Sequence, residues 1–234
     1  MIFQKLILGV ARMDETIKIG FVGSKTEDII LYISRILFNM DMNIAVMDTS
    51  EQQLLKYSVP ESIPINLLTS YRNVDFYIGC CNKENYKKVD ISKYNVIIIN
   101  FGLNPAFVKE LMSCSLRFAV TDLERSSVLR LKEYLEMLDC SYEFIRIYRD
   151  VVDSKIDKSY LDSLLDIATV VKEYYFYISE KELCCRLDSQ YNDIFRFSGL
   201  PKEYSAMFKD ILVDSLSFNR KDVEMAIKKA EKGK

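Results

Sequence analysis

Residues 17–50, IKIGFVGSKTEDIILYISRILFNMDMNIAVMDTS, decide the fold. The apolar run at 17–22 is typical of a strand, 23–26 form a turn, and 27–39 have the apolar period of a helix. A second apolar run follows at 43–47 and ends at Asp48. Because this length suits a βαβ crossover, we expect the two strands to be parallel neighbours. The turn and Asp48 would then lie at the carboxyl edge of the sheet, where open parallel sheets bind ligands.

The same alternation of strands and helices continues to the end of the chain. Pattern and turn residues predict strands and helices as follows: strands at 65–68, 74–80, 95–100, 116–121, 142–148 and 174–178; helices from 104, at 122–138, at 156–171, from 179, at 203–212 and at 219–232. This pattern predicts an α/β fold with a doubly wound, mostly parallel sheet and helices on both faces. No linker divides the chain, so we expect one domain over 1–234, with an N-terminal extension at 1–16.

Composition narrows the classes of function. The 234 residues are 49% apolar and 28% charged, with a formal net charge of −2, so we expect no nucleic acid partner. There is no apolar run of about 18 residues, and the start is a poor signal peptide (Met13 could be an alternative start). A cytoplasmic location follows as the default.

Six cysteines and no histidine limit the chemistry further. Cys80-Cys81 and Cys184-Cys185 are adjacent pairs without the C-x-x-C spacing of a zinc site, and we expect buried, reduced thiols. The absence of histidine removes His-based triads, His metal ligands and the usual general base. We predict no metal site and no catalytic residue.

The turn at 23–26 has the position of a phosphate-binding loop. Lys25-Thr26 stands directly after a strand and opens a helix, where the pattern G-x-x-x-x-G-K-[ST] has its Lys and its Ser or Thr. The glycine positions of that pattern hold Ile19 and Ser24, while Gly20 and Gly23 are out of register. Ser24 and Glu27 also fit a capping box, in which the turn is closed by its own side chains.

The arrangement of elements resembles the ParA/MinD group of deviant P-loop ATPases, including the TadZ/CpaE proteins of pilus assembly. The resemblance rests on the strand, loop and helix at the start, on the later strands that end in polar residues, and on a turn near the C-terminus: 17–39, 45–50, 94–100, 120–122 and 200–203. It implies a P-loop NTPase-like fold. It also implies a nucleotide site formed by Gly23, Ser24, Lys25, Thr26 and Asp48.

Several positions depart from the pattern of that group. The signature first Lys of its loop falls at Gly20, the second acidic position after the second strand holds Ser50, and the acid that ends the central strand is Asn100. Glu27 and Asp28 would place negative charge beside any phosphate. We therefore interpret the nucleotide site as vestigial and predict no bound cofactor, with ATP and magnesium as the alternative.

The C-terminal residues 219–234 form a basic amphipathic segment. Residues 220–234 contain six basic and three acidic side chains, and four apolar residues recur at helical spacing: Val223, Ala226, Ile227 and Ala230. The resemblance to MinD suggests weak peripheral membrane contact through this helix. The alternative is a helix packed on its own domain.

The predicted function is that of a non-catalytic positioning or assembly factor, possible partners being a pilus or secretion machine. We expect protein partners, either a second copy in a homodimer or a component of such a machine. The first alternative is an active nucleotide-dependent ATPase with an atypical loop. The second is a small-molecule enzyme of the same architecture that uses Asp48 and Asp122.

Overall fold

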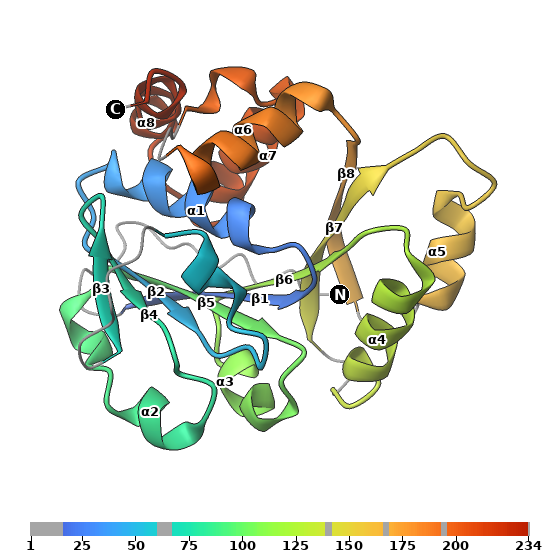
Figure 1. Ribbon diagram of the computed structural model, residues 1–234, viewed down its shortest axis with the longest axis horizontal. Coiled ribbons are helices and arrows are strands. Elements are labelled where there is room, and N and C mark those ends of the chain that lie inside the picture. The colour runs from blue at the N-terminus through green and yellow to red at the C-terminus, as the bar shows by residue number, and fades with distance from the viewer. Residues whose placement is uncertain (1–15, 60–66, 139–141, 166–168, 193–195, 234) are drawn as a thin grey trace, which may run out of the picture.

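One mixed sheet forms the centre of the molecule. The computed structural model describes residues 16–59, 67–138, 142–165, 169–192 and 196–233. Eight strands pair in the order β3-β4-β2-β5-β1-β6-β7-β8, and every pair is parallel except the antiparallel β3–β4 hairpin (Figure 1). The predicted α/β class and mostly parallel sheet are confirmed.

The strands are β1 (Ile17–Gly23), β2 (Ile44–Asp48), β3 (Leu68–Tyr71), β4 (Val74–Tyr77), β5 (Val96–Gly102), β6 (Leu116–Thr121), β7 (Glu143–Val151) and β8 (Thr169–Tyr177). The α-helices are α1 (Glu27–Phe38), α2 (Lys83–Lys87), α3 (Val108–Met112), α4 (Arg125–Leu135), α5 (Lys158–Leu164), α6 (Glu180–Tyr191), α7 (Lys202–Lys209) and α8 (Arg220–Glu231). A π-helical segment, Asp210–Ser215, continues α7.

The predicted neighbour relation between the first two strands is wrong. β1 and β2 are parallel, but β5 lies between them and pairs with both. All seven residues of β5 are buried, and its apolar side chains alternate between the two faces of the sheet. A strand that is apolar on both faces is most stable in the middle of a sheet covered by helices on each side, which accounts for this order.

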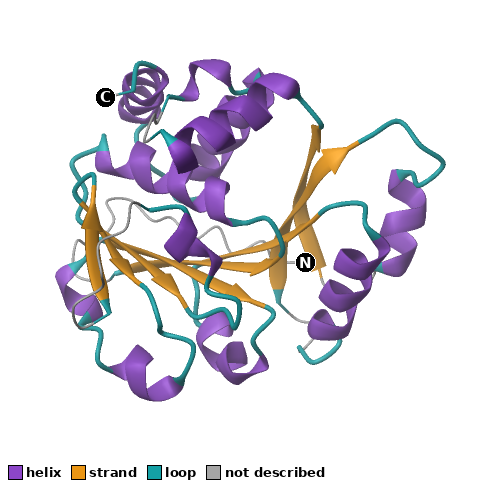
Figure 2. Ribbon diagram, in the orientation of Figure 1, coloured by secondary structure: helices purple, strands orange, loops and turns teal. Residues whose placement is uncertain are grey.

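Helices cover both faces of the sheet, as predicted. Figure 2 shows α1, α6, α7 and α8 on one side and α2 to α5 on the other. The first side packs Ile98 of β5 in a core with α1, α7 and α8. The second packs Ile97 and Ile99 against residues of α3, α4 and α5. The sheet therefore separates two apolar cores.

The C-terminal helix α8 packs on its own domain. All four apolar residues of its predicted amphipathic face are buried, and the helix lies against α1. The apolar face on which the prediction of membrane contact through 219–234 depended is therefore occupied. Within the described residues, no helix has the length and apolar character needed to cross a membrane.

Three predicted boundaries are wrong. Among the described residues, the strand predicted at 65–68 begins only at Leu68 and continues to Tyr71, as β3. The helix predicted at 156–171 is only the seven-residue α5, and β8 begins at Thr169 instead of at 174. Val170 and Val171 are β-branched and favour a strand, although they also fit the apolar period of the predicted helix.

The cysteines follow the prediction only in part. Cys80 is buried as expected, whereas Cys81 and Cys184 are exposed. The five described cysteines are all free thiols, and residues 1–15 of the predicted N-terminal extension lie outside the described residues.

Candidate functional site

The turn at residues 23–26 is shorter than a phosphate-binding loop. β1 continues to Gly23, so residues 19–23 of the eight-residue pattern at 19–26 belong to a strand. That strand is paired with β5 on one side and with β6 on the other. Because the backbone groups of a strand paired on both sides face its neighbours, they do not converge on a ligand. The N–H of Ser24 also donates to the carbonyl of Val120, at 3.0 Å.

Gly23 is required by this path of the chain. Its φ is +110°, a backbone conformation that L side chains rarely adopt, and a Cβ built there would lie 1.8 Å from the carbonyl oxygen of Val120. A glycine at this position therefore allows β1 to lie close to β6. This packing role is separate from the binding of a phosphate.

Lys25 is held by two carboxylates from other strands. Its Nζ lies 2.8 Å from Oδ2 of Asp122, which directly follows β6, and 2.8 Å from Oδ2 of Asp150 in β7. Burial lowers the pKa of Lys25, but both ion pairs outweigh that effect and the pKa is raised. Lys25 is thus a cation whose two contacts are acids of its own chain.

Asp48 and Thr26 also have partners within the fold. Asp48 is fully buried, and its carboxylate accepts hydrogen bonds from the Ser50 hydroxyl (2.6 Å) and from the N–H groups of Ser50 and Leu55 (3.1 Å each). The Thr26 hydroxyl donates to Oδ1 of Asn100 at 3.1 Å, and Nδ2 of Asn100 lies 3.4 Å from Asp48. Burial raises the pKa of Asp48, and these hydrogen bonds oppose the rise. Hydrogen bonds through Asn100 thus connect Thr26 at the start of α1 with Asp48 at the end of β2.

The predicted capping box at Ser24 and Glu27 is absent. The N-cap of α1 is Thr26, and it forms no side-chain capping bond. Within the described residues, the buried hydroxyl oxygen of Ser24 has no hydrogen-bond partner. The turn is therefore closed by residues far away in the sequence instead of by its own side chains. The left-handed backbone of Lys25, with φ of +55°, explains the difference, because a capping box needs an extended cap residue next to regular helix.

The buried Arg149 forms a hydrogen bond with the backbone of the turn. Arg149 of β7 is fully buried, and its guanidinium donates to the carbonyl of Lys25 (2.8 Å), to both carboxylate oxygens of Asp28, and to Glu182 of α6 (2.6 Å). The Tyr204 hydroxyl of α7 lies 3.1 Å away. Although burial opposes its charge, the surrounding acids keep the pKa of Arg149 well above its ordinary value. Asp28, which the sequence placed beside a phosphate, instead neutralises this arginine.

Glu27 is an acid in an unfavourable environment. Burial raises its pKa to about 7, and the nearby charges of Asp28 and Asp48 act in the same direction. Asp48 is the last residue of β2, so Glu27 lies toward the middle of the carboxyl edge. The result is a carboxyl group that changes charge near neutral pH.

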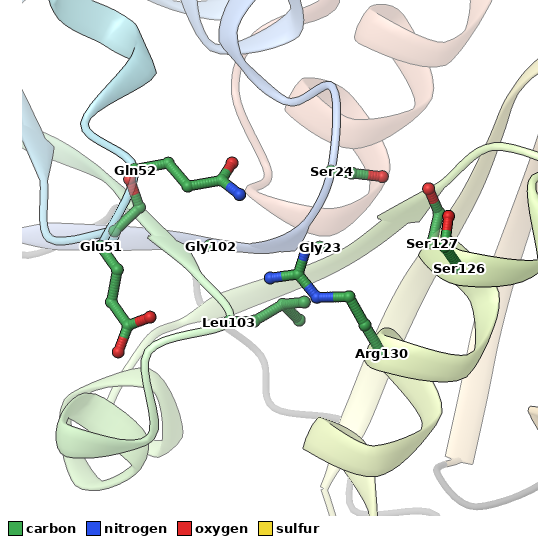
Figure 3. A pocket seen from close by; sticks show the side chains of 10 residues that line it. Gly23, Ser24, Glu51, Gln52, Gly102, Leu103, Ser126, Ser127 and Arg130 are labelled. Atoms are coloured by element: carbon green, nitrogen blue, oxygen red, sulfur yellow. The ribbon is translucent and has the colours of Figure 1, made fainter.

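A small cavity lies at this edge of the sheet. It has a volume of about 110 Å³ and is lined by the turn, by the segments after β2 and β5, and by α4: Gly23, Ser24, Ser50, Glu51, Gln52, Gly102, Leu103, Ser126, Ser127 and Arg130. Figure 3 shows Arg130 reaching from α4 toward Gly23, with the hydroxyls of Ser24 and Ser127 above it. Drug-sized ligand sites usually measure 300 Å³ or more, so this cavity suits an ion or a fragment.

The structure brings together all the predicted site residues: Gly23, Ser24, Lys25, Thr26 and Asp48. From the sequence, Asp122 was expected at a strand end without a partner, and Arg149 and Asp150 were not expected in the site. The signal was available, because an Arg-Asp pair at the end of an apolar strand places charges where burial is expected. Among the described residues, no three His, Cys, Asp or Glu side chains are arranged to hold a metal ion.

Known structures share this fold. The first is a ParA family ATPase from Chlorobium tepidum TLS, with a TM-score of 0.58 and 15% identity over 88% of this chain and 100% of that one. A putative plasmid partition protein from Borrelia burgdorferi B31, bound to AMPPNP, has a TM-score of 0.56 and 16% identity over 87% and 99%. A chain of the MinC:MinD cell division protein complex from Aquifex aeolicus has 0.52 and 10% over 92% and 95%.

These likenesses establish the architecture: the chain has the α/β fold of ParA and MinD ATPases. At 10–16% identity, the fold is all that they show. No protein-family model matches the sequence, and no curated protein matches it.

Proposed function

We propose that this protein is a ParA/MinD-like positioning or assembly factor that works without nucleotide hydrolysis and acts through protein partners. The observation that carries the proposal is the double ion pair of Lys25. In the resembling ATPases this lysine would neutralise phosphate, but here Asp122 and Asp150 occupy its ammonium group. A triphosphate would have to displace both carboxylates and would then lie beside their negative charges.

Three further features support the loss of nucleotide chemistry. The pairing of residues 19–23 in β1 leaves little backbone to surround a phosphate. The Thr26 hydroxyl is directed to Asn100, a neutral group that supplies no charge for magnesium. The cavity beside the turn is small for a nucleotide. A magnesium–nucleotide therefore fits these residues poorly.

A partner-dependent role is consistent with the relatives of similar fold. One of them is part of a complex of MinC with MinD, and another is named as a plasmid partition protein. Those partners belong to those proteins. For this chain we propose a protein partner, with a pilus or secretion machine as the candidate setting and the cytoplasm as the location.

Titration calorimetry of the full chain with ATP and with ADP, each with magnesium, tests the proposal. We expect no binding stronger than a Kd of about 1 mM. The matched comparison is Lys25→Ala. Micromolar binding to the natural sequence that this substitution abolishes would overturn the proposal and establish the alternative, a nucleotide switch with an atypical loop.

One observation favours the alternative of a nucleotide switch. The unpartnered hydroxyl of Ser24, the hydroxyls of Ser126 and Ser127, and the guanidinium of Arg130 surround one cavity. Such groups suit an anion the size of phosphate. If ATP binds, Arg130→Gln should weaken binding at least tenfold, whereas Arg125→Gln on the same helix should not.

A further inference from the structure

The outer edge of β8 carries an unusual amount of exposed apolar surface. Within the described part of the chain, β8 is the last strand of the sheet, next to β7, and it is nine residues long (Figure 1). Val171 is 49% exposed, Tyr177 is 66% exposed, and Ile178, which follows the strand, is 58% exposed. At the opposite edge, β3 has only four residues. A long, apolar edge strand is a template for pairing with another strand.

The charges on β8 do not protect this edge. Edge strands are usually protected by charged side chains that would clash with an incoming strand. β8 has two charged residues, and both are neutralised within the chain. Glu173 is paired with Arg146 and Lys158, and Lys172 lies 3.6 Å from Asp214. The strand therefore presents its edge without an unbalanced charge.

We propose that β8 pairs with β8 of a second copy in an antiparallel, two-fold symmetric arrangement centred on Tyr174, so that one sheet runs through both copies. The register argues for a second copy in particular. About this centre Val171 faces Tyr177 of the other copy twice, and Val170 faces Ile178 twice. The exposed Val171, Tyr177 and Ile178 and the half-buried Val170 of one edge thus complement the same residues of the other.

The same register avoids repulsion between like charges. It places the carboxylate of Glu173 opposite Tyr175, whose hydroxyl already contacts Glu173 within one chain at 3.2 Å. A shift of the centre to Glu173 would bring two carboxylates face to face, and a shift to Lys172 would bring two ammonium groups together. A shift to Tyr175 would place Tyr177 opposite Glu173. The pairing centred on Tyr174 matches Val171 with Tyr177 and Val170 with Ile178, and it places Lys172 opposite the apolar Phe176.

This pairing deepens the proposed function by naming a surface for the second copy, and it rests on that proposal only for the biological role. The interface does not include Lys25, Asp122 or the cavity beside the turn. Oligomeric state therefore tests the interface, while calorimetry tests nucleotide use, and either result can fail without the other.

Sedimentation equilibrium of the full chain over a wide concentration range tests the interface. We expect a monomer–dimer equilibrium that Tyr177→Lys weakens at least tenfold. Tyr57→Lys is the matched control, because Tyr57 is equally exposed, at 67%, and lies in a short 3-10 helix, Leu54–Tyr57, that follows β2, a strand not adjacent to β8. It should leave dimerisation unchanged.

A charge-pair variant tests the register. Val171→Glu alone should weaken dimerisation as Tyr177→Lys does. The double variant with both substitutions should restore it, because each introduced acid then faces an introduced base in the other copy. A chain that stays monomeric at every concentration would overturn the proposal. So would a dimer that ignores Tyr177→Lys, or a double variant no better than the single ones.

Discussion

At the scale of single residues, the charged groups of the candidate site contact one another. Lys25 has the position of a phosphate-binding lysine, yet it contacts Asp122 and Asp150. Asp28, in the first turn of α1, contacts Arg149. Every one of these charges is matched by an opposite charge from the chain itself. These ion pairs connect the turn and the start of α1 with the carboxyl ends of β6 and β7.

Removal of the Lys25 ammonium group should show how much its two ion pairs contribute to the stability of the fold. We expect Lys25→Met to lower the free energy of unfolding by about 1–2 kcal/mol at pH 7, less than for a fully buried pair because Lys25 is 38% exposed. Lys83→Met is the matched control. Lys83 is 39% exposed but has a single carboxylate partner, Glu110, so we expect a loss below about 1 kcal/mol.

The loss caused by Lys25→Met should shrink in acid. Although burial opposes it, the Lys25 contact lowers the pKa of Asp150 below its ordinary value. A carboxyl with a lowered pKa in the folded state contributes stability above its unfolded pKa of about 4, and this contribution is lost as the pH falls through the folded pKa. Urea unfolding at pH 7 and pH 3 measures both differences. Equal losses at the two pH values would contradict this contribution of the ion pairs.

Glu27 should show the opposite pH dependence. Its pKa is raised to about 7 in the folded chain, so the folded state binds more protons than the unfolded state between pH 4.5 and 7, and stability falls as the pH rises through this window. Glu27→Gln should therefore raise the melting temperature at pH 8 and have little effect at pH 4.5. Thermal melts measure this, with the exposed Glu51→Gln as a control that should change neither. A gain at pH 4.5 as large as at pH 8 would refute it.

At the scale of secondary structure elements, the sequence predicted whether a segment is a strand or a helix better than it predicted which strands pair. The apolar run at 95–100 identified β5, because a strand buried on both faces has a distinctive pattern. The neighbour of β1 could not be predicted, since pairing between β1 and β5 is decided by the whole sheet and not by either segment. For the same reason the position of Lys25 is visible in the sequence, whereas its pairing with Asp150, 125 residues away, is not.

The C-terminal helix α8 provides a test at this scale. Val223 is fully buried in the core shared with α1, whereas Met225 on the same helix is 55% exposed. We expect Val223→Glu to destabilise the protein by about 3 kcal/mol, because it buries a charge without a partner. Met225→Glu should change stability by less than about 0.5 kcal/mol. Chemical unfolding of both variants measures this, and similar values would show that α8 does not dock as described.

At the scale of the whole molecule, one buried cation joins segments that are far apart in the sequence. Arg149 of β7 contacts α1 through Asp28, α6 through Glu182 and α7 through Tyr204. The helices of this face are thus attached to the sheet by ionic contacts as well as by apolar packing. These contacts also fix the carbonyl of Lys25 and with it the path of the turn.

Substitution of this arginine should destabilise the entire domain. Arg149→Met leaves the buried Asp28 without its cation and leaves Glu182 with Arg186 alone, and we expect a loss of about 3–5 kcal/mol. Tyr204→Phe removes one hydrogen bond of the same cluster and should cost about 1 kcal/mol. Because Arg149 and the shared apolar core both tie these helices to the sheet, unfolding followed by circular dichroism and by tyrosine fluorescence should remain a single transition. A small loss for Arg149→Met would mean that the cluster is not the link described.

The position of β5 between β1 and β2 also has a consequence for biosynthesis. Until β5 has been synthesised, β1 has neither of its partner strands, although β2, β4 and β3 can already pair with one another. A nascent chain halted at residue 95 therefore leaves β1 unpaired beside the apolar face of α1. We expect the central sheet to close only after residue 102 leaves the exit tunnel, and the growing polypeptide to be a client for chaperones until then.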